Sequence, residues 1–410
     1  MKATMREAGA LLLAALVVRL AGAWSLGEGA PFGPDGTGAE AAVHLGGHLY
    51  PLHIALISLV GDGRTLSVLS GTATVLLLWV YGRRQGLGST GGWLAATLPL
   101  AVYPSCLTAG DAPALTLVVA GATLATLGRG AAVAGGAIAL AAIAVKPVVL
   151  PALVLLVPRP LAMVGIVLGL PAAVRWLKPL VDPKVDGGLL GTWWQASGGA
   201  PPGSAEEVLA LLGGGLQALT AAPLWALVPL GLVAVIGAVR PGAARAEGAA
   251  HDHAGPDRTT RALVLAPLVG LLVTAALFGE RLAPRYLMAS VLALLPWAGA
   301  AVARRWAAVL LLPTAALLTQ VSAYRATADP TARVPTLPTV PIPPVDAQPL
   351  FDESSTEGAT ALRAEAAALA TTLPEGATVT VERRPHGREG ELVWPLRVAR
   401  PDVRFEIVSP

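Results

Sequence analysis

The sequence predicts an all-α polytopic membrane protein with about eleven transmembrane helices and a small external α/β module at its C-terminal end. The 410-residue chain is 54% hydrophobic. Only 13% of its residues are charged, whereas ordinary soluble domains have about 25% charged residues. The basic residues also fall in short clusters between apolar runs, a distribution typical of membrane topology.

The remaining composition excludes some classes of protein. A formal net charge of +3 in short clusters does not predict a nucleic-acid-binding protein. A single cysteine, Cys106, excludes an intrachain disulfide framework. Residues 8–23 resemble a signal peptide with a cleavage site at Ala21-Gly22-Ala23. Arg19 inside that run, and the many apolar runs that follow, favour a spanning helix instead.

A transmembrane helix needs about 20 mostly apolar residues. The runs that meet or approach this length lie at about 8–24, 64–82, 91–107, 112–128, 161–177, 221–239, 262–279, 284–303 and 306–322. Residues 49–60 are too short to cross and predict a helix lying on the outer face of the membrane.

Residues 131–157 allow two interpretations. They form either one long helix with Lys146 in its middle, or two short helices that meet at Lys146-Pro147. A charge at the bilayer centre costs at least ~2.5–3.5 kcal/mol, and proline breaks the helical hydrogen bonding. Both effects favour two short helices, which bring the total to about eleven.

The distribution of charge predicts the orientation. Lys2 and Arg6 precede the first run, so the N-terminus is expected on the cytoplasmic side of the inner (plasma) membrane. Arg83-Arg84 mark the same side. Because the number of spans is odd, the C-terminus is expected to be external.

Three regions follow from these runs. Residues 1–324 form the predicted transmembrane domain, whose first external loop covers residues 25–63. A proline-rich linker spans 325–350, and a small external α/β tail spans 351–410. Within the tail we predict a helix over 358–372 and strands over 377–382, 391–398 and 402–408.

The first external loop carries two carboxylates. Asp35 lies between Pro34 and Gly36, which is a turn sequence. It is either an Asx-turn residue in a solvated loop or a general base held near the headgroup plane. Glu40 is interpreted as lining or bracing the same site.

The histidines of this loop leave a metal site open. His44, His48 and His53 are spaced four and five residues apart, from which a metal site is conceivable. Gly46-Gly47 interrupt the helix between them, which favours roles as polar braces or headgroup contacts. No cofactor follows from the sequence, and a divalent cation stays open.

Further candidates lie at the expected outer ends of the spans. Asp111, before Pro113, suits an N-cap and is also the second acidic candidate for the site, two roles that can coexist. Lys146 suits an anionic lipid phosphate, with snorkelling as the alternative. Arg285, followed by Tyr286, is either a bidentate phosphate clamp or an interface anchor, and Arg19 has the same two interpretations.

Two neighbouring tryptophans, Trp193-Trp194, lie in the long loop that the sequence predicts over residues 178–220. They are either part of an interfacial aromatic belt or a stacking platform for a sugar.

The order of several short motifs resembles the GT-C membrane glycosyltransferases, which include the protein O-mannosyltransferases of family 39 and the lipid A aminoarabinose transferases. The similar segments, between about residues 10 and 322, are Arg19-Leu20, Pro34-Asp35 with Glu40-Ala41-Ala42, Tyr50-Pro51-Leu52-His53-Ile54, Arg64-Thr65-Leu66-Ser67 through Tyr81-Gly82-Arg83-Arg84, Tyr103-Pro104 with Ala109-Gly110-Asp111, Val145-Lys146-Pro147 and Pro284-Arg285-Tyr286-Leu287.

The resemblance implies an inverting transferase that moves a sugar from a polyprenyl-phosphate donor to a hydroxyl of a protein, glycan or lipid acceptor on the external face. It implies that Asp35 is the catalytic base and that Asp111 positions substrate or a metal. It also implies that Lys146 and Arg285 hold the donor phosphate. The further residues expected to contact substrate are Tyr286, Arg19, His53, Trp193 and Trp194.

Two alternatives remain. Many similar proteins have Asp-Glu where this chain has Asp35-Gly36, and Gly38 replaces an aromatic residue, so a non-catalytic paralogue stays open. A transporter or flippase of a lipid-linked or small polar substrate is the other, and it would need polar residues deep within several spans.

Overall fold

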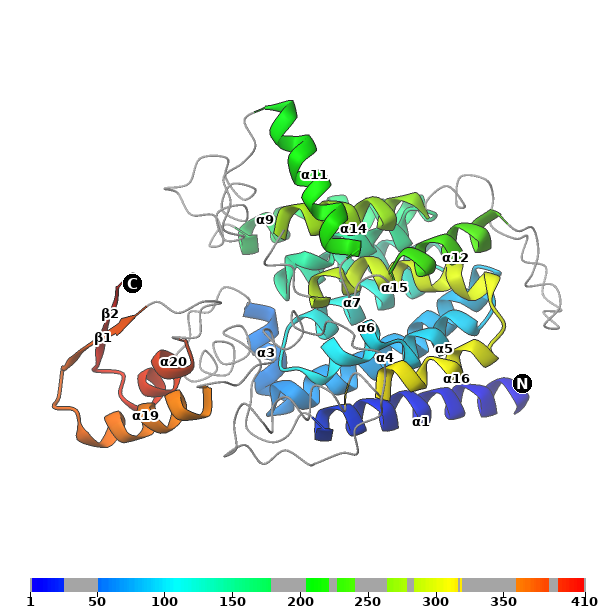
Figure 1. Ribbon diagram of the computed structural model, residues 1–410. Coiled ribbons are helices and arrows are strands. Elements are labelled where there is room, and N and C mark those ends of the chain that lie inside the picture. Colours follow the sequence, from blue (N-terminus) through cyan, green and yellow to red (C-terminus); the bar gives the residue numbers. More distant parts are fainter. Residues whose placement is uncertain are drawn as a thin grey trace.

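A computed structural model describes residues 2–25, 51–177, 204–220, 227–239, 264–278, 284–315, 318, 359–382 and 390–408. Figure 1 shows a body of packed helices, coloured from blue to yellow, and a separate small module in orange and red. The described part of the chain is therefore mostly helical, as the sequence predicts.

The body contains α-helices and short 3₁₀ helices, the latter labelled η. In chain order they are α1 (Lys2–Ser25), α3 (Pro51–Val60), α4 (Gly63–Arg84), α5 (Thr90–Thr97), α6 (Pro99–Val102), η1 (Tyr103–Cys106), α7 (Asp111–Leu124), α8 (Arg129–Ala141), η2 (Ala142–Ala144), η3 (Pro147–Leu156), α9 (Pro160–Leu177), α11 (Ala205–Thr220), α12 (Leu227–Val239), α14 (Leu265–Phe278), α15 (Pro284–Ala301) and α16 (Arg305–Val309).

Helix α4 packs against α1, α5 and α7. Its start is capped by Asp62, whose carboxylate accepts the Thr65 N–H at 2.6 Å. Burial acts to raise the pKa of Asp62, but the hydrogen bonds from Thr65 and the charge of Arg64 outweigh it and lower the pKa. Arg83 and Arg84 lie in the last turn, where cations are favoured by the helix dipole. Asp62 and these arginines therefore set the two ends of α4.

The predicted span at 91–107 is wrong as a continuous helix. Pro99 and Pro104 divide it into α5, α6 and η1, because proline has no N–H to donate to the carbonyl four residues earlier. The Ala95 carbonyl, which Pro99 leaves without its helical partner, accepts a hydrogen bond from the Arg19 guanidinium at 3.1 Å. The nearby Thr97 carbonyl accepts one from the Thr314 hydroxyl. Side chains from distant helices thus repair the break.

The two-helix interpretation of residues 131–157 is confirmed. Helix α8 ends at Ala141, η2 ends at Ala144, and η3 begins at Pro147. Lys146 between them is extended, with φ −164° and ψ 122°, as expected for a residue that precedes proline.

Backbones of α8 and α9 touch where both helices have glycine. A Cβ added to Gly136 would lie 1.9 Å from the Ala162 carbonyl oxygen, and one added to Gly165 would lie 2.0 Å from that of Val133. No larger residue fits at either position without separating the helices. This contact holds α9 against the part of the chain that leads to Lys146.

Two described helices, Thr4–Ser25 and Gly63–Arg84, are long and apolar enough to cross a membrane by length and composition. The other apolar helices have 10–17 residues. The prediction of about eleven transmembrane helices is therefore not supported by the described helices. Prolines and glycines shorten the apolar runs, which composition alone counts as continuous.

A helix also forms within the long loop predicted over residues 178–220. This helix is α11 (Ala205–Thr220), which contacts α14 and projects from the body in Figure 1. Glu206 and Glu207 occupy its first turn, where carboxylates favour the helix N-terminus.

The C-terminal module comprises α19 (Ala359–Thr372), β1 (Thr378–Glu382), α20 (Gly390–Ala399) and β2 (Arg404–Val408). The strands pair in parallel, with Thr378 opposite Arg404. The strand predicted at 391–398 is wrong, because this segment is helix α20. Parallel strands need a crossover connection, usually a helix, and α20 buries Leu392, Val393 and Leu396 in the same small core as Leu362 and Val381.

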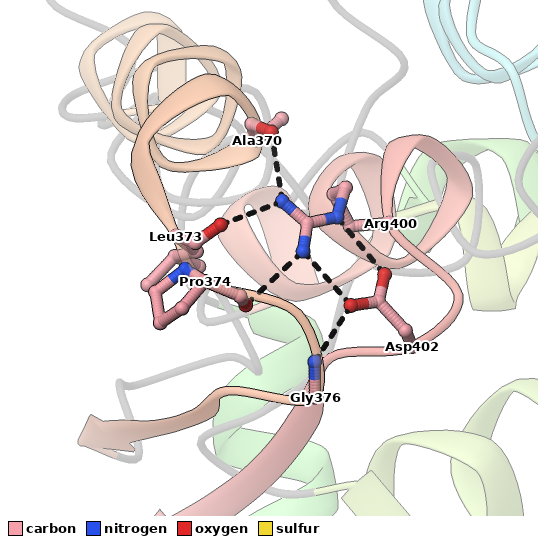
Figure 2. Close-up of polar contacts among 6 residues, drawn as sticks. All are labelled: Ala370, Leu373, Pro374, Gly376, Arg400 and Asp402. Carbon is pink, nitrogen blue, oxygen red and sulfur yellow. Dashed lines mark hydrogen bonds and ion pairs between the residues drawn. The ribbon is translucent and has the colours of Figure 1, made fainter.

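Figure 2 shows how Arg400 closes this module. Its guanidinium donates to the carbonyls of Ala370, Leu373 and Pro374 at the end of α19. It also donates to the Asp402 carboxylate, which accepts the Gly376 N–H at 2.9 Å. Gly376 has φ +69°, a left-handed conformation that glycine adopts at no steric cost. One arginine thus joins the end of α19 to the turns before both strands.

Candidate functional site

A buried group of polar residues, here called the Asp111 cluster, lies where α3, α7, η3 and α15 begin or meet. Its members are Asp111, Lys146, Arg285, Tyr286 and His53. All five are residues that the sequence predicts to be functional. Figure 1 shows α7 and α15 side by side in the body, and both contact η3.

Asp111 is the first residue of α7. A carboxylate is favoured there by the helix dipole, and Pro113 fits the first turn because its missing N–H has no helical partner in any case. The N-cap is Gly110, so the interpretation of Asp111 as an N-cap is wrong. Its side chain is left to interact with other elements.

Lys146 reaches that carboxylate across 35 residues of sequence. Its Nζ lies 2.9 Å from Oδ2 of Asp111, and the side chains are 7% and 1% exposed, respectively. Because Lys146 sits at the extended break before Pro147, its side chain is not held along a helix surface. Removing one partner of such a pair leaves a buried charge uncompensated.

Arg285 and Tyr286 open α15 beside this ion pair. The Tyr286 ring centroid lies 5.7 Å from Nζ of Lys146 and 5.2 Å from Cζ of Arg285. Both distances are within the range of cation–π attraction. The tyrosine ring therefore lies near both cations, which repel each other less when an electron-rich face is close to each.

His53 brings α3 to the same place. A Cβ on Gly110 would lie 3.3 Å from both the His53 Nδ1 and the Val145 carbonyl oxygen. Gly110 precedes Asp111 and Val145 precedes Lys146, so the buried imidazole lies at the junction of the segments that carry the ion pair. His53 is also close in sequence to the end of residues 26–50, which connect α1 to α3.

The cluster brings charges of both signs together. Lys146 and Arg285 are cations, and Asp111 supplies one carboxylate, of which Oδ1 has no hydrogen-bond partner among the described residues. Two cations and one carboxylate thus meet at the ends of three helices, an arrangement that can contact an anionic group.

Arg19 has a different environment. It is fully buried, and its guanidinium donates to the carbonyls of Ala15, Ala95 and Ala101. These contacts brace α1 against the break between α5 and α6. They indicate a structural role, and the predicted role of Arg19 in substrate binding stays a prediction.

Several predicted site residues lie outside the described residues. These are Asp35, Glu40, Trp193 and Trp194, together with His44 and His48. Their roles therefore stay predictions. Within the described ranges, no group of three or more His, Cys, Asp or Glu side chains could hold a metal ion. Asp111 is neutralised by Lys146, so it does not by itself form a cation site.

Sequence reasoning missed a second polar group, at the opposite end of α4. The Glu7 carboxylate accepts hydrogen bonds from Arg83 at 3.4 Å, from Trp93 Nε1 at 3.4 Å and from Arg304 at 3.1 Å. In the sequence, Arg83-Arg84 and Arg304-Arg305 are recognisable only as pairs of basic residues. Glu7 is 76 residues from Arg83 and 297 residues from Arg304, so no local pattern indicates that it contacts them.

Comparison of the chain with protein-family models, with curated protein sequences and with solved structures gives no match.

Proposed function

We propose that this chain is an integral membrane glycosyltransferase that moves a sugar from a polyprenyl-phosphate donor to an acceptor hydroxyl, with inversion. The observation that carries the proposal is the Asp111 cluster, in which the Lys146–Asp111 ion pair and Arg285 lie beside the same tyrosine ring. The resemblance of the segments around its residues to the GT-C enzymes supplies the reaction class.

The surface of α1 supports membrane insertion. Leu13, Val17, Leu20 and Trp24 are each at least half exposed and share one helix face. The opposite face packs on the body through buried residues such as Leu11 and Ala15. An exposed apolar stripe of this length suits lipid chains better than water.

Helix α4 supports the same conclusion by its length. Its 22 residues extend over about 33 Å at 1.5 Å per residue, close to the ~30 Å thickness of the hydrocarbon core. The Asp111 cluster lies near its start, since Ser67 of α4 donates to the Ala109 carbonyl. The Glu7 carboxylate lies near its end.

The charges at the two ends differ. The described basic residues at the Glu7 end are Lys2, Arg6, Arg83, Arg84, Arg129, Arg159, Arg304 and Arg305, and those toward the Asp111 end are Arg19, Arg64, Lys146, Arg175 and Arg285. Because positive residues favour the cytoplasmic side, this asymmetry supports an external Asp111 cluster.

A polyprenyl-phosphate sugar keeps its chain in lipid, so its phosphate must lie near the membrane surface. Lys146 and Arg285 can bind phosphate oxygens through charge-assisted hydrogen bonds. Asp111 keeps Lys146 in place through their ion pair. Tyr286 can cover the bound group, and His53 lies at the start of α3, which follows in sequence the loop that carries Asp35.

The reaction itself needs one base. The acceptor oxygen attacks the anomeric carbon while the bond from that carbon to the phosphate oxygen breaks, and the lipid phosphate leaves with the electron pair. Asp35 takes the hydroxyl proton. Lys146 and Arg285 stabilise the negative charge that develops on the phosphate.

The test is sugar transfer by the purified chain in lipid nanodiscs, with labelled polyprenyl-phosphate sugars and hydroxyl acceptors. We expect Asp35→Asn to lower turnover by a factor of about 10²–10⁴, the usual contribution of a general base, without changing membrane insertion. Asp402→Asn makes the same chemical change in the C-terminal module and should transfer normally. Wild-type turnover by Asp35→Asn would contradict the proposal.

The burial of Asp111 and Lys146 specifically favours a second candidate, a flippase of a lipid-linked substrate, because buried ionisable groups also mark transport pathways. Vesicle reconstitution separates the two. Movement of the donor between leaflets without sugar transfer would identify a flippase.

A further inference from the structure

The glycosyl transfer proposed above does not use the second polar group. Here it is called the Glu7 cluster and defined as Glu7, Trp79, Arg83, Trp93 and Arg304. We propose that the Glu7 cluster, with Arg305 beside it, is a binding site for the headgroup of an anionic phospholipid. This inference rests on the membrane insertion contained in the proposed function, but not on any transferase activity.

The geometry of Glu7 holds two guanidinium groups close together. Arg83 lies 3.4 Å from Oε2 of Glu7, and Arg304 lies 3.1 Å from Oε1. Two cations near one carboxylate leave a net positive charge. A guanidinium has five N–H donors, and among the described residues the hydrogen bonds of Arg83 and Arg304 go only to Glu7. Donors therefore remain for an oxyanion.

Aromatic rings hold the same two side chains in place. The Arg304 Cζ lies 4.0 Å from the centroid of Trp93, and the Arg83 Cζ lies 5.0 Å from that of Trp79. Trp93 also donates its indole N–H to Glu7. The arginines are thus ordered before a ligand arrives, which lowers the entropy cost of binding.

The site is open to a ligand despite these contacts. The side chains of Arg83 and Arg304 are 41% and 44% exposed, whereas that of Glu7 is 17% exposed. The arginines therefore face outward and the carboxylate lies behind them. Arg305 is exposed and makes no hydrogen bond to a described residue. Trp306, which is 53% exposed, is suited to the membrane interface.

The position of the site selects a lipid over a free anion. It lies at the end of α4 and α15 where basic residues predominate, and the helical segment that follows Arg304 leaves the apolar side chains of Trp306, Val309 and Leu312 exposed. A headgroup phosphate can therefore contact the arginines while its acyl chains cover that apolar surface. A phosphodiester with one negative charge matches two guanidiniums and one carboxylate.

The experiment measures lipid affinity of the full chain by native mass spectrometry from a neutral detergent. The probes are phosphatidylglycerol, which is anionic, and phosphatidylcholine, which is not. We expect wild type to prefer phosphatidylglycerol. We expect each of Arg83→Gln, Arg304→Gln and Arg305→Gln to weaken that preference roughly fivefold, the effect of about 1 kcal/mol per charge near an anionic surface.

Arg305→Gln is the decisive variant, because the exposed Arg305 side chain makes no hydrogen bond or ion pair with a described residue, and its loss should not affect folding. Arg397→Gln is the matched control, since Arg397 also lies over a tryptophan, with Cζ 5.9 Å from the Trp394 ring, but in the C-terminal module. It should keep the wild-type preference. Thermal melting in detergent checks that each variant is folded.

Three outcomes would overturn the inference. One is equal affinity of wild type for the two lipids, and another is an unchanged preference in folded Arg305→Gln and Arg304→Gln. The third is displacement of the lipid by a soluble acidic peptide at equal concentration, which would assign the surface to an acidic protein. None of these outcomes depends on sugar transfer, so the two proposals fail separately.

Discussion

The body and the C-terminal module each contain an ion pair, and the two pairs have nearly the same length. Lys146 lies 2.9 Å from Asp111 in the body, and Arg400 lies 2.8 Å from Asp402 in the module. Their surroundings differ. The side chains of the first pair are 7% and 1% exposed, whereas those of the second are 22% and 33% exposed.

This difference shows that distance alone does not define what an ion pair does. Near the surface, water and salt compete with each partner, and such pairs contribute little to the free energy of unfolding. In the body, neither charge has water to replace its partner, so the loss of one strongly destabilises the other. The buried pair is therefore a point where the loss or exchange of a partner has large consequences, as expected at a binding site.

The sharpest test of this comparison is to remove one charge from the buried pair. We expect Asp111→Asn or Lys146→Met to lower the free energy of unfolding by about 3–5 kcal/mol, because the remaining group stays buried after it loses an ion-pair partner at 2.9 Å. Thermal and denaturant unfolding in detergent would measure the change. The double variant Asp111→Leu with Lys146→Met should regain most of the stability while remaining inactive. A double variant as unstable as the single ones would show that packing, not charge, dominates.

Arg19 offers an intermediate case, a buried cation whose described partners are carbonyl dipoles instead of a carboxylate. Arg19→Met should lower the free energy of unfolding by about 1–3 kcal/mol, since the Ala95 and Ala101 carbonyls lose a donor. Exposed Arg6, on the same helix, serves as the control, and Arg6→Met should stay within about 0.5 kcal/mol of wild type. Equal effects of the two substitutions would refute the bracing role.

The smallest effect is expected at the exposed pair. The hydrogen bond from Arg400, and then that from the Gly376 N–H, lower the pKa of Asp402 below its ordinary value. The folded-state pKa of Asp402 is thus below the unfolded value of about 3.9. The ionised carboxylate therefore stabilises the fold above that unfolded value, and this stabilisation is lost as the pH falls toward the folded-state pKa.

Hydrogen exchange of the Gly376 amide, corrected for the intrinsic rate, would report this loss. Exchange should also quicken in about 1 M salt, where exposed charges are screened within ~3 Å. Asp402→Asn should remove the dependence on pH. Persistence of that dependence in Asp402→Asn would assign it to another group.

Much of the fold could be predicted because its signals are local. Apolar runs predict α1, α4 and α7, and Lys146-Pro147 predicts the break between η2 and η3. The same reasoning failed where the composition of an apolar run does not show how long its helices are. Residues 91–107 look like one span, yet Pro99 and Pro104 divide them. Residues 391–398 look like a strand, yet the parallel pairing of β1 and β2 requires a crossover connection between them, and helix α20 lies in that connection.

For the candidate site too, only the local signals could be predicted from the sequence. Residue types and neighbouring motifs indicated Asp111, Lys146, Arg285, Tyr286 and His53 one at a time. Their shared place at the outer ends of the predicted spans favoured their meeting, but the pairing of Asp111 with Lys146 could not be derived, because the intervals between these residues follow no helical or strand period. Arg19 is a different case, since its hydrogen bonds to the Ala95 and Ala101 carbonyls depend on the packing of distant helices and could not be predicted from its place near a helix end.

By itself, the sequence determined the helical and apolar character of the chain, the positions at which proline interrupts it, and the residue types available for chemistry. These properties depend on neighbours within a few residues. The tertiary structure alone decided that Asp111 pairs with Lys146 and that Glu7 holds Arg83 and Arg304. Such pairings depend on how helices pack, and close glycine contacts such as that of Gly136 with Ala162 set the packing through shape, which no local pattern of polarity encodes.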